Sequence, residues 1–324
     1  MLLALSACAV LAGSCGSGDG SGPSDASVDA ALPDAGPPPD AGPPPDAGPP
    51  PDAGPPPDAG PPPDAGAPSP EGTFRFLTYN VAGLPDLISG SNPAVNTPIM
   101  SPLLNAYDIV LAQEDFSYHD ALIGAATHDY ISGPSAAPIG RTFGDGLGRL
   151  SVFAFTDLAR EQWDECNGIV GAGTDCLAGK GFTMASHEIA SGVSVHIYNL
   201  HMDAGRSGDD YSAREAQSRQ LIAYMAAHSA AATVIVAGDT NLKEDDEPLL
   251  LELLAMAALT DVCRSLSCPD PHLHDRVMYR NAPGLEITPT LWQLDDRFVD
   301  GSGDDLSDHL AVGVDFAWRR TAAP

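Results

Sequence analysis

Basic residues are scarce in this chain of 324 residues, which has 15 Lys and Arg against 44 Asp and Glu and a formal net charge of −29 at pH 7. Ten of the acidic residues and none of the basic ones precede Thr73, so the rest of the chain still carries −19. Tight binding to a long polyanion needs a basic surface, and this charge balance does not favour it. Bound divalent cations would change the local field, so a nuclease is not excluded.

Large apolar side chains are nearly absent from residues 16–70, which contain no aromatic residue and only Val28 and Leu32 among the large aliphatics. Such a segment cannot bury enough surface to offset its chain entropy, and we expect it to be disordered. The hexapeptide PPPDAG repeats five times between Pro37 and Gly66. Triple proline favours polyproline II and each Gly interrupts it, so the repeats predict a semi-rigid stalk. Slippage in a repetitive gene, tolerated where nothing folds, would leave the same pattern.

Long hydrophobic runs are also missing, because the apolar stretch at residues 1–15 (MLLALSACAVLAGSC) is too short to span a membrane. Small residues precede Cys8 and Cys15, and the sequences LSAC and AGSC both resemble a bacterial lipobox. We expect a signal segment with a lipidated cysteine that anchors the protein to a membrane, with Cys8 the better match. A signal peptide that is simply removed is the alternative. Either interpretation predicts a secreted or cell-surface protein of the bacterial envelope.

Residues 73–320 look globular, and their length suits one α/β domain behind a linker at residues 16–72. A Pro- and Asn-rich connection is expected up to Pro102. Alternating or continuous apolar runs predict strands, and apolar residues at helical spacing predict helices. The expected strands are 74–81, 107–114, 148–155, 181–189, 193–201, 234–238, 275–280 and 310–316, and the expected helices are 213–227 and 248–259. Hairpins mixed with strand-helix-strand units predict a mixed sheet.

Four cysteines lie in this domain, and their proximity in sequence pairs Cys166 with Cys176 and Cys263 with Cys268. In an exported protein, short-range disulfides are the default interpretation. A zinc site is the alternative, although no CxxC or His-x-x-His spacing accompanies the cysteines.

Polar residues follow several of the predicted strands. The stretch VIVAGDTN stops at a glycine and then presents Asp239 and Asn241, which alternation along a strand would aim into one cleft. Three other runs close on polar residues, and a further pair precedes the last strand. These residues are Asn80 in LTYN, Glu114 in LAQE, His201 in HIYNLH, and Asp308 with His309 before LAVGVDF. Together they predict one site at the edge of a sheet.

Oxygen donors dominate this set, which suits Mg²⁺, Mn²⁺ or Ca²⁺ better than a soft metal. A neutral imidazole can take a proton from water, and an imidazolium can stabilise charge on a phosphoryl oxygen. Either role needs a carboxylate to fix the tautomer, and Asp275 in HDRVMYR is the candidate. Taken singly, such residues are more often turn formers, caps or solvated side chains. Their order along the chain is what favours a functional interpretation.

The succession TYN, QE, NLH, GDTN, DRV and SDH resembles the endonuclease/exonuclease/phosphatase superfamily, the group with DNase I-like folds that includes bacterial sphingomyelinases. The resemblance covers Thr73 to Trp318. It implies a four-layered α/β sandwich of two mixed β-sheets flanked by helices, with the site at one edge. The segment DCLAGKGF, from Asp175 to Phe182, is similar to secreted bacterial members.

The resemblance also implies roles for individual residues. Asn80 and Glu114 would bind the divalent metal, and Asp308 would complete the network of metal and water. His201 would hydrogen-bond the phosphate and is a candidate to protonate the leaving oxygen.

Four further residues would act around the attacking water. Asp239 and Asn241 would orient that water and hold the phosphoryl group, while Asp275 would orient His309. The implied reaction is in-line attack of water on a phosphorus ester. Either Asp239 or His309 could be the base.

The sequence therefore predicts a monomeric, metal-dependent phosphoric-ester hydrolase, a phosphodiesterase displayed on a stalk. The expected substrate is a phospholipid headgroup or small phosphodiester; an extracellular DNase I-like endonuclease and a non-catalytic phosphate-binding module are the alternatives. Five basic residues could line a substrate groove, although ordinary surface placement is expected for most of them. They are Arg141, Arg149, Lys180, Arg206 and Arg214.

Overall fold

The computed structural model describes residues 69–85, 91–168 and 175–322. The predicted signal segment, the predicted stalk of PPPDAG repeats and the linker up to residue 68 lie outside the described residues. Among the residues described, no helix combines the length and apolar character needed to cross a membrane.

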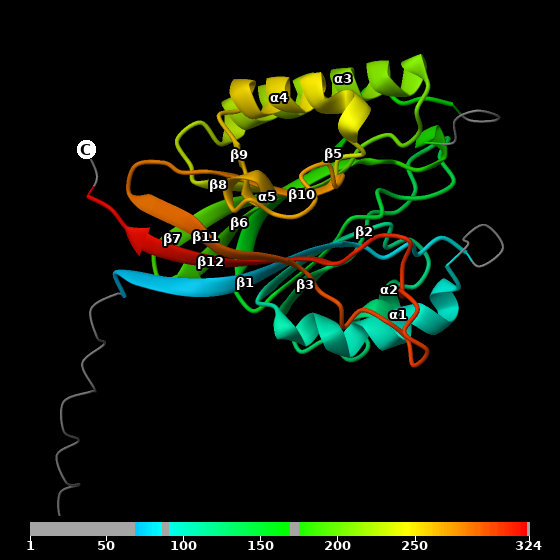
Figure 1. The fold of residues 1–324 in the computed structure, drawn as a ribbon, viewed down its shortest axis with the longest axis horizontal. Coiled ribbons are helices and arrows are strands. Elements are labelled where there is room, and N and C mark those ends of the chain that lie inside the picture. Colours follow the sequence, from blue (N-terminus) through cyan, green and yellow to red (C-terminus); the bar gives the residue numbers. More distant parts are fainter. Residues whose placement is uncertain (1–68, 86–90, 169–174, 323–324) are drawn as a thin grey trace, which may run out of the picture. The chain divides into compact units, whose positions relative to one another are not determined.

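Two six-stranded sheets form the centre of the domain (Figure 1). The first has the order β11-β12-β1-β2-β4-β3 and the second the order β5-β6-β7-β8-β10-β9. The strands of the first sheet are β1 (Glu71–Asn80), β2 (Ile109–Gln113), β3 (Tyr130–Ser132), β4 (Gly148–Ser151), β11 (Leu285–Leu294) and β12 (Val312–Arg320). Those of the second are β5 (Phe155–Gln162), β6 (Gly181–Ala190), β7 (Val193–His201), β8 (Val234–Asp239), β9 (Thr260–Asp261) and β10 (Asp275–Arg280).

Each sheet is mixed, as the sequence predicts. The pair β1 and β2 is parallel in the first sheet, and the pair β7 and β8 is parallel in the second. The other named pairs are antiparallel, including the predicted hairpin of β6 and β7, which turns through Gly192 at a φ of 65°. A positive φ there suits glycine, which lacks the Cβ that would clash.

Helices cover the outer face of each sheet, so the domain has four layers (Figure 1). In Figure 1, α1 and α2 lie below the first sheet, and α3 and α4 lie above the second. The helices are α1 (Pro93–Leu103), α2 (His119–Ile123), α3 (Gly208–His228), α4 (Glu247–Met256) and α5 (Val262–Ser265), with short 3₁₀ turns at Leu104–Ala106, Asp175–Leu177 and Glu244–Asp246.

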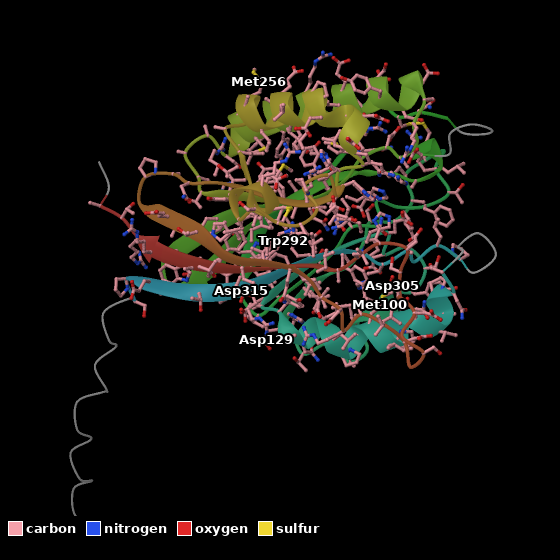
Figure 2. The ribbon with its side chains drawn as sticks, in the orientation of Figure 1. Met100, Asp129, Met256, Trp292, Asp305 and Asp315 are labelled. Carbon is pink, nitrogen blue, oxygen red and sulfur yellow. A yellow bond between two sulfur atoms is a disulfide. The ribbon has the colours of Figure 1, made fainter. Side chains whose placement is uncertain are left out.

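The core follows from alternation along the strands. On β1, Phe74 and Phe76 pack between the two sheets, whereas Leu77 and Tyr79 pack on the side of α1. A third apolar cluster joins the second sheet to α3 and α4. Figure 2 shows the same partition at the helices, because Met256 projects from the outer side of α4 and is 66 % exposed.

A polar layer replaces the apolar one between the sheets towards one end of the strands. Gln113 Nε2 donates to Asn199 Oδ1 across the sheets at 2.7 Å, and Asn199 Nδ2 donates to the carbonyls of Ala112 and Gly148 at 2.9 Å each. Arg149, also fully buried, donates to the carbonyl of Ile197. These bonds fix the spacing of the two sheets beside the polar strand ends.

Two stretches differ from their sequence-based predictions. The connection before Pro102 contains helix α1, which begins with Pro93 at its first turn and includes Pro98. The predicted strand 148–155 is two strands, because the chain leaves the first sheet after Ser151 and enters the second at Phe155. Its apolar alternation continues through the bend and therefore does not mark the change of sheet.

Candidate active site

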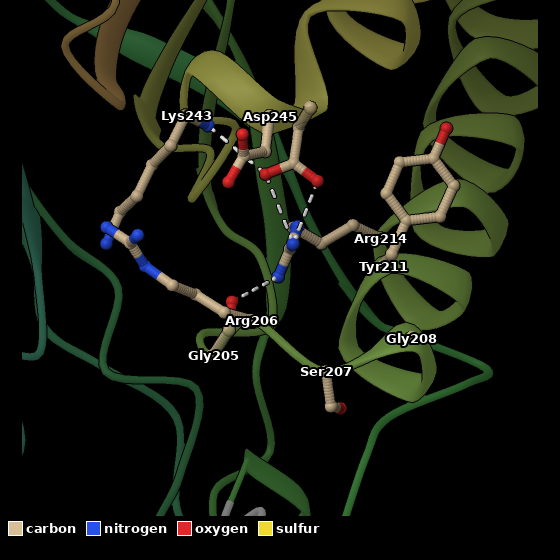
Figure 3. A pocket seen from close by; sticks show the side chains of 9 residues that line it. Gly205, Arg206, Ser207, Gly208, Tyr211, Arg214, Lys243 and Asp245 are labelled. Carbon is tan, nitrogen blue, oxygen red and sulfur yellow. Dashed lines mark hydrogen bonds and ion pairs between the residues drawn. The ribbon is translucent and has the colours of Figure 1, made fainter.

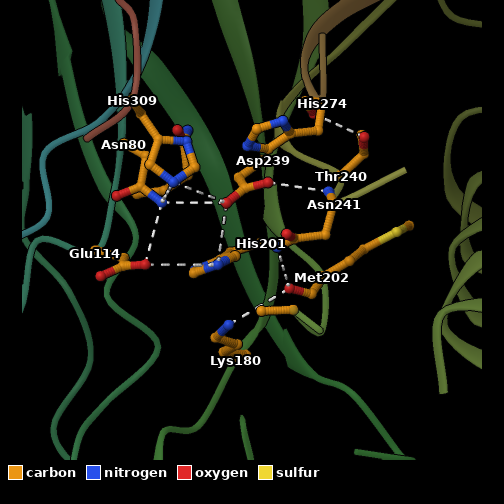
Figure 4. A network of polar contacts seen from close by, with 12 residues as sticks. Asn80, Glu114, Lys180, His201, Met202, Asp239, Thr240, Asn241, His274 and His309 are labelled. Carbon is orange, nitrogen blue, oxygen red and sulfur yellow. Dashed lines mark hydrogen bonds and ion pairs between the residues drawn. The ribbon is translucent and has the colours of Figure 1, made fainter. Parts of the chain in front are cut away.

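The strand ends that carry the predicted site residues meet at one end of the two sheets. Because β7 and β8 are parallel, His201 pairs with Asp239 at their carboxyl ends. Strand β10 runs antiparallel to β8, so Asp275 at its start also pairs with Asp239. The first sheet brings Asn80 from the end of β1 and, immediately after β2, Glu114. Figure 4 shows the side chains of Asn80, Glu114, His201 and Asp239 converging.

Asn80 lies at the centre of the cluster and is fully buried. Its Nδ2 lies 3.2 Å from Glu114 Oε1, 3.2 Å from Asp239 Oδ2 and 3.4 Å from His309 Nε2. Its Oδ1 accepts from the backbone N–H of Ala82. The amide therefore joins a carboxylate from the first sheet to one from the second.

Glu114 sits at a φ of 55°, an uncommon backbone conformation that a non-glycine residue adopts mainly where surrounding structure imposes it. Its side chain is 21 % exposed, so one carboxylate of the cluster faces the surface. Burial raises the pKa of Glu114, against the opposing attraction of Lys180 and the hydrogen bond from Asn80. A cation placed beside this carboxylate would stabilise its ionised form.

His201 is a neutral imidazole in this setting. Its Nε2 lies 3.3 Å from Asp239 Oδ2 and 3.9 Å from Glu114 Oε1, and its Nδ1 is buried without a hydrogen-bond partner. Burial, reinforced by the positive charge of Lys180, lowers the pKa of His201 to about 3. At neutral pH the ring can therefore donate one N–H but carries no positive charge.

His309 is the opposite case. Its Nδ1 lies 2.9 Å from Asp275 Oδ2, as the resemblance implies, and its Nε2 faces Asp239 Oδ2 at 3.9 Å. Burial would lower the pKa of His309, but the hydrogen bond and charge of Asp275 outweigh it and raise the pKa to about 9. Burial also raises the pKa of Asp275, against the attraction of His309. The pair therefore presents an imidazolium to the site at neutral pH.

The sequence predicts that alternation along a strand aims Asp239 and Asn241 into one cleft, but in the structure a turn, not the strand, positions Asn241. Strand β8 ends at Asp239, and Asn241 follows in a left-handed turn at a φ of 50°. The turn is closed by Asp239 Oδ1, which accepts from the Asn241 N–H at 2.9 Å, and Asn241 Nδ2 donates to the Met202 carbonyl at 3.1 Å. A short side chain bonding its own backbone two residues on is typical of such turns. Burial would raise the pKa of Asp239, but the neighbouring imidazoles and Lys180 lower it overall.

Asp308 stands apart from this cluster. Its side chain is exposed, and the hydrogen bond shown for it in the described structure is a long one of 3.5 Å from Ser307 Oγ. Ser307 holds the segment in place by donating to the Asn80 carbonyl at 2.7 Å and accepting from the His309 N–H. The structure thus brings together seven of the eight predicted residues and leaves Asp308 at the margin.

Comparison with known proteins gives the same architecture. No family model matches the chain. A sphingomyelinase of Mycobacterium tuberculosis is 33 % identical over 267 residues, which cover 76 % of this chain and 53 % of that protein. The chain thus spans about half the length of the curated relatives that it matches.

Two solved structures illustrate the fold. A mutant of beta toxin from Staphylococcus aureus with bound magnesium ions has a TM-score of 0.57 and 15 % identity, covering 75 % of this chain and 99 % of that one. D. rerio TDP2, complexed with a single-strand DNA product, has a TM-score of 0.58 and 19 % identity, covering 75 % and 98 %. The chain is thus similar in sequence to a sphingomyelinase and shares the fold of these two structures, in agreement with the resemblance to the endonuclease/exonuclease/phosphatase superfamily.

The sequence names Lys180 only as one of the basic residues that could line a groove, and the structure places it at the site (Figure 4). Its Nζ lies 2.5 Å from Asp175 Oδ1, and its side chain is only 10 % exposed. Burial would lower the pKa of Lys180, but attraction to Asp175 and Glu114 raises it overall. The segment DCLAGKGF carries both residues, and its resemblance to secreted bacterial members of the superfamily is the available sequence signal.

The donor set of this site fits a divalent cation. Glu114 and Asp239 supply carboxylate oxygens that share the same amide and imidazole neighbours, which suits Mg²⁺ or another hard ion. Asp239, His274 and His309 also lie close enough to share an ion. That set offers one carboxylate and two imidazoles, whereas Mg²⁺ prefers oxygen donors. The carboxylate pair is therefore the better candidate.

The other predicted groove residues are mostly structural, and the expectation of ordinary surface placement is wrong for three of the five. Arg149 and Arg214 are almost fully buried, like Lys180. Arg214 binds both carboxylate oxygens of Asp246, at 2.9 and 3.2 Å, beside a hollow of about 170 Å³ (Figure 3). Arg206, which also lines that hollow, is exposed.

The cysteines form the two predicted disulfides. Cys166 bonds Cys176, and Cys263 bonds Cys268. The zinc alternative is therefore wrong, because no free thiolate remains in either pair. The first disulfide closes the loop that ends beside Asp175.

Proposed function

We propose that this domain is a metal-dependent phosphodiesterase that cleaves phospholipid headgroups. The observation that carries the proposal is the convergence of Glu114, Asp239, His201 and His309 from both sheets on one polar cluster, with distances between 3.2 and 3.9 Å linking them directly or through Asn80. Two carboxylates beside a neutral and a charged imidazole provide both acid and base functions at neutral pH.

Glu114 and Asp239 are the residues that would hold Mg²⁺, with Asn80 between them and Asp308 at the margin. A divalent cation held there would supply positive charge for the phosphoryl oxygens and favour attack by water. Mn²⁺ and Ca²⁺ share the preference for oxygen donors.

The protonation states of Asp239, His309 and His201 indicate a different catalytic role for each residue. Asp239 stays ionised at neutral pH because its pKa is lowered, so it can orient the attacking water and accept its proton. His309 carries positive charge and can stabilise the phosphoryl group or donate a proton to the leaving oxygen. His201 is neutral and can hydrogen-bond the phosphate. These assignments favour Asp239 over His309 as the base.

The choice of a lipid headgroup over nucleic acid rests on charge and similarity. The part of the chain from Thr73 onward carries −19, which repels a long polyanion. The mycobacterial relative that is 33 % identical is a sphingomyelinase. A DNase I-like activity is the second candidate because TDP2, whose fold is similar, is complexed with a DNA product.

A substrate panel tests the proposal. The full chain is assayed with sphingomyelin, bis-p-nitrophenyl phosphate and plasmid DNA in Mg²⁺, Mn²⁺ and Ca²⁺, each with a chelator control. We expect cation-dependent release of phosphocholine from sphingomyelin, slower cleavage of the aryl diester and little nicking of DNA. His201→Ala should lower kcat by about 100-fold or more, since it removes a donor aimed at developing charge.

Each alternative gives a distinct result. Cleavage of DNA in preference to sphingomyelin would identify a nuclease. Cation binding without turnover of any substrate would leave a phosphate-binding module. Activity of His201→Ala close to that of the wild type would remove this histidine from the mechanism.

The same proposal places the enzyme outside the cytoplasm, held by a lipidated cysteine at the end of the PPPDAG stalk. The two disulfides support an oxidising compartment. Metabolic labelling with palmitate should mark the wild type and not the Cys8→Ser variant. Label that survives in Cys8→Ser and is lost in Cys15→Ser would move the anchor to the second cysteine.

A further inference from the structure

A cavity of about 270 Å³ adjoins the site on the side of Glu114. Its walls are mainly apolar and come from separate segments of the chain: Leu84, Phe116, Phe143, Leu177 and Ala178. Its polar end is formed by Glu114 with the ion pair of Asp175 and Lys180. The cavity therefore has an apolar part and, at its other end, charged groups that adjoin the cluster of polar residues described above.

Backbone hydrogen bonds hold two of these walls together. The N–H groups of Thr142 and Phe143 donate to the Leu177 carbonyl at 2.7 and 3.1 Å, and the Gly179 N–H donates to the Phe143 carbonyl at 3.0 Å. A Cβ at Gly179 would approach Pro138 to within 2.9 Å, so the two segments pack closely. The disulfide between Cys166 and Cys176 lies directly before Leu177.

The wall formed by Phe116 is also closely packed. The ring of Phe116 packs against Gly146, where an added Cβ would lie only 2.5 Å from it. The rings of Phe116 and Phe143 are 5.4 Å apart between centroids. Both side chains are half-buried and line the cavity from different loops. The apolar space is therefore built into the folded domain.

The size and lining of the cavity limit its occupant. A dry apolar cavity of about 150 Å³ admits benzene, so 270 Å³ accommodates a ring or a branched alkyl group but not a whole lipid. Two aromatic rings and two leucines offer such a group contact without hydrogen bonds. A cationic group would meet Lys180 at the polar end; of the two carboxylates there, Asp175 is already paired with Lys180 and Glu114 is a proposed ligand of the divalent cation.

We infer that this cavity is a subsite for the uncharged apolar substituent of the phosphoester, the part of the alcohol nearest to the phosphorus. The inference rests on the proposed function, because the substituent enters the cavity only if the phosphate of the substrate lies at Glu114 and Lys180. The subsite would discriminate between substrates by their alcohol. The catalytic cluster cannot do so, because every phosphodiester presents the same phosphoryl oxygens. Esters of apolar alcohols are bound here, and those of small or polar alcohols lose this contact.

Calorimetric binding in the presence of Mg²⁺ tests the subsite without depending on turnover. The probes are methyl phosphate, 3,3-dimethylbutyl phosphate and phosphocholine, the last two being nearly isosteric. For the wild type we expect 3,3-dimethylbutyl phosphate to bind at least tenfold more tightly than methyl phosphate, and more tightly than phosphocholine. The ratio between the two alkyl phosphates should fall below threefold in Phe143→Ala and in Leu177→Gln.

Leu251→Gln is the matched control, because Leu251 is 50 % exposed on α4 and does not line the cavity. It should keep the wild-type ratio, and circular dichroism should show that all three variants are folded. Equal affinity of the wild type for both alkyl phosphates, or a preference that survives in both cavity variants, would overturn the inference. Preferential binding of phosphocholine that depends on Phe143 would overturn it in favour of a cation site. Absence of turnover in the substrate panel with a confirmed binding ratio would reject the proposed catalysis alone.

Discussion

Single residues of the same type take opposite protonation states in this site. His201 and His309 both face Asp239, yet burial lowers the pKa of one ring to about 3 while Asp275 raises that of the other to about 9. Only His309 has a carboxylate on its far nitrogen, and His201 Nδ1 has no such partner. The second contact of each ring therefore decides its charge.

This difference predicts a pH dependence of stability. The pKa of His309 in the folded protein lies above its unfolded value of about 6.5, so its contribution is complete below pH 6.5. That contribution is lost as the pH rises through about 9. Urea unfolding of the wild type and His309→Gln should differ by about 3 kcal/mol at most near pH 6. The difference should shrink by pH 10; a difference independent of pH would contradict the raised pKa.

At the scale of elements, the polar layer between the sheets sets the position of the site. Strands β2 and β7 belong to different sheets, and their link is the hydrogen bond from Gln113 to Asn199 together with the two that Asn199 donates. The layer lies next to Asn80. Thr78 and Asn80 are two residues apart on the same face of β1, and Thr78 Oγ1 accepts a hydrogen bond from Gln113 Nε2.

The layer can be tested by removing its central residue. Asn199→Ala would remove one acceptor of Gln113 Nε2, which keeps its bond to Thr78, and the side-chain donor of two buried carbonyls, which should lower the free energy of unfolding by about 3 kcal/mol. Asn105→Ala is the control, because the hydrogen bonds of Asn105, in the 3₁₀ turn Leu104–Ala106, are exposed and water can replace them. Urea denaturation measures both, and equal losses would show that the buried layer has no special role.

How far the elements follow from sequence depends on whether the signal is local. The apolar run of β8 and the spacing of α3 are local, and the structure confirms both. Helix α1 is missed because Pro98 and Pro102 suggest a break, although Pro at a helix start is favourable and tertiary packing keeps the helix intact. The change of sheet between Ser151 and Phe155 has no periodicity to mark it.

The candidate site shows the same limit. Strand ends and ordered motifs indicate Asn80, Glu114, His201, Asp239 and His309, and the structure brings them together. Lys180 and His274 could not be placed this way. Lys180 gains its position from an ion pair with Asp175 and from the packing of its loop, and His274 from the edge-on contact of its ring with that of His309.

For the whole molecule, the site exists only where the two sheets meet. Glu114 comes from the first sheet and Asp239 from the second, and Asn80 and His201 each lie beside both of them. Neither sheet alone carries the carboxylate pair that would hold a cation. The acidic character of the chain makes that cation more important, since it would offset negative charge at the place where a phosphate must bind.

The most direct measurement of this account is a double-mutant cycle on Mg²⁺-dependent hydrolysis of one phosphodiester by wild type, Glu114→Gln, Asp239→Asn and the double variant. If both carboxylates act on the same phosphoester, each single change should lower kcat/KM by about 100-fold or more, and the double change should cost far less than the product of the two. Independent, multiplicative losses, or near-wild-type activity of either single variant, would contradict a shared site.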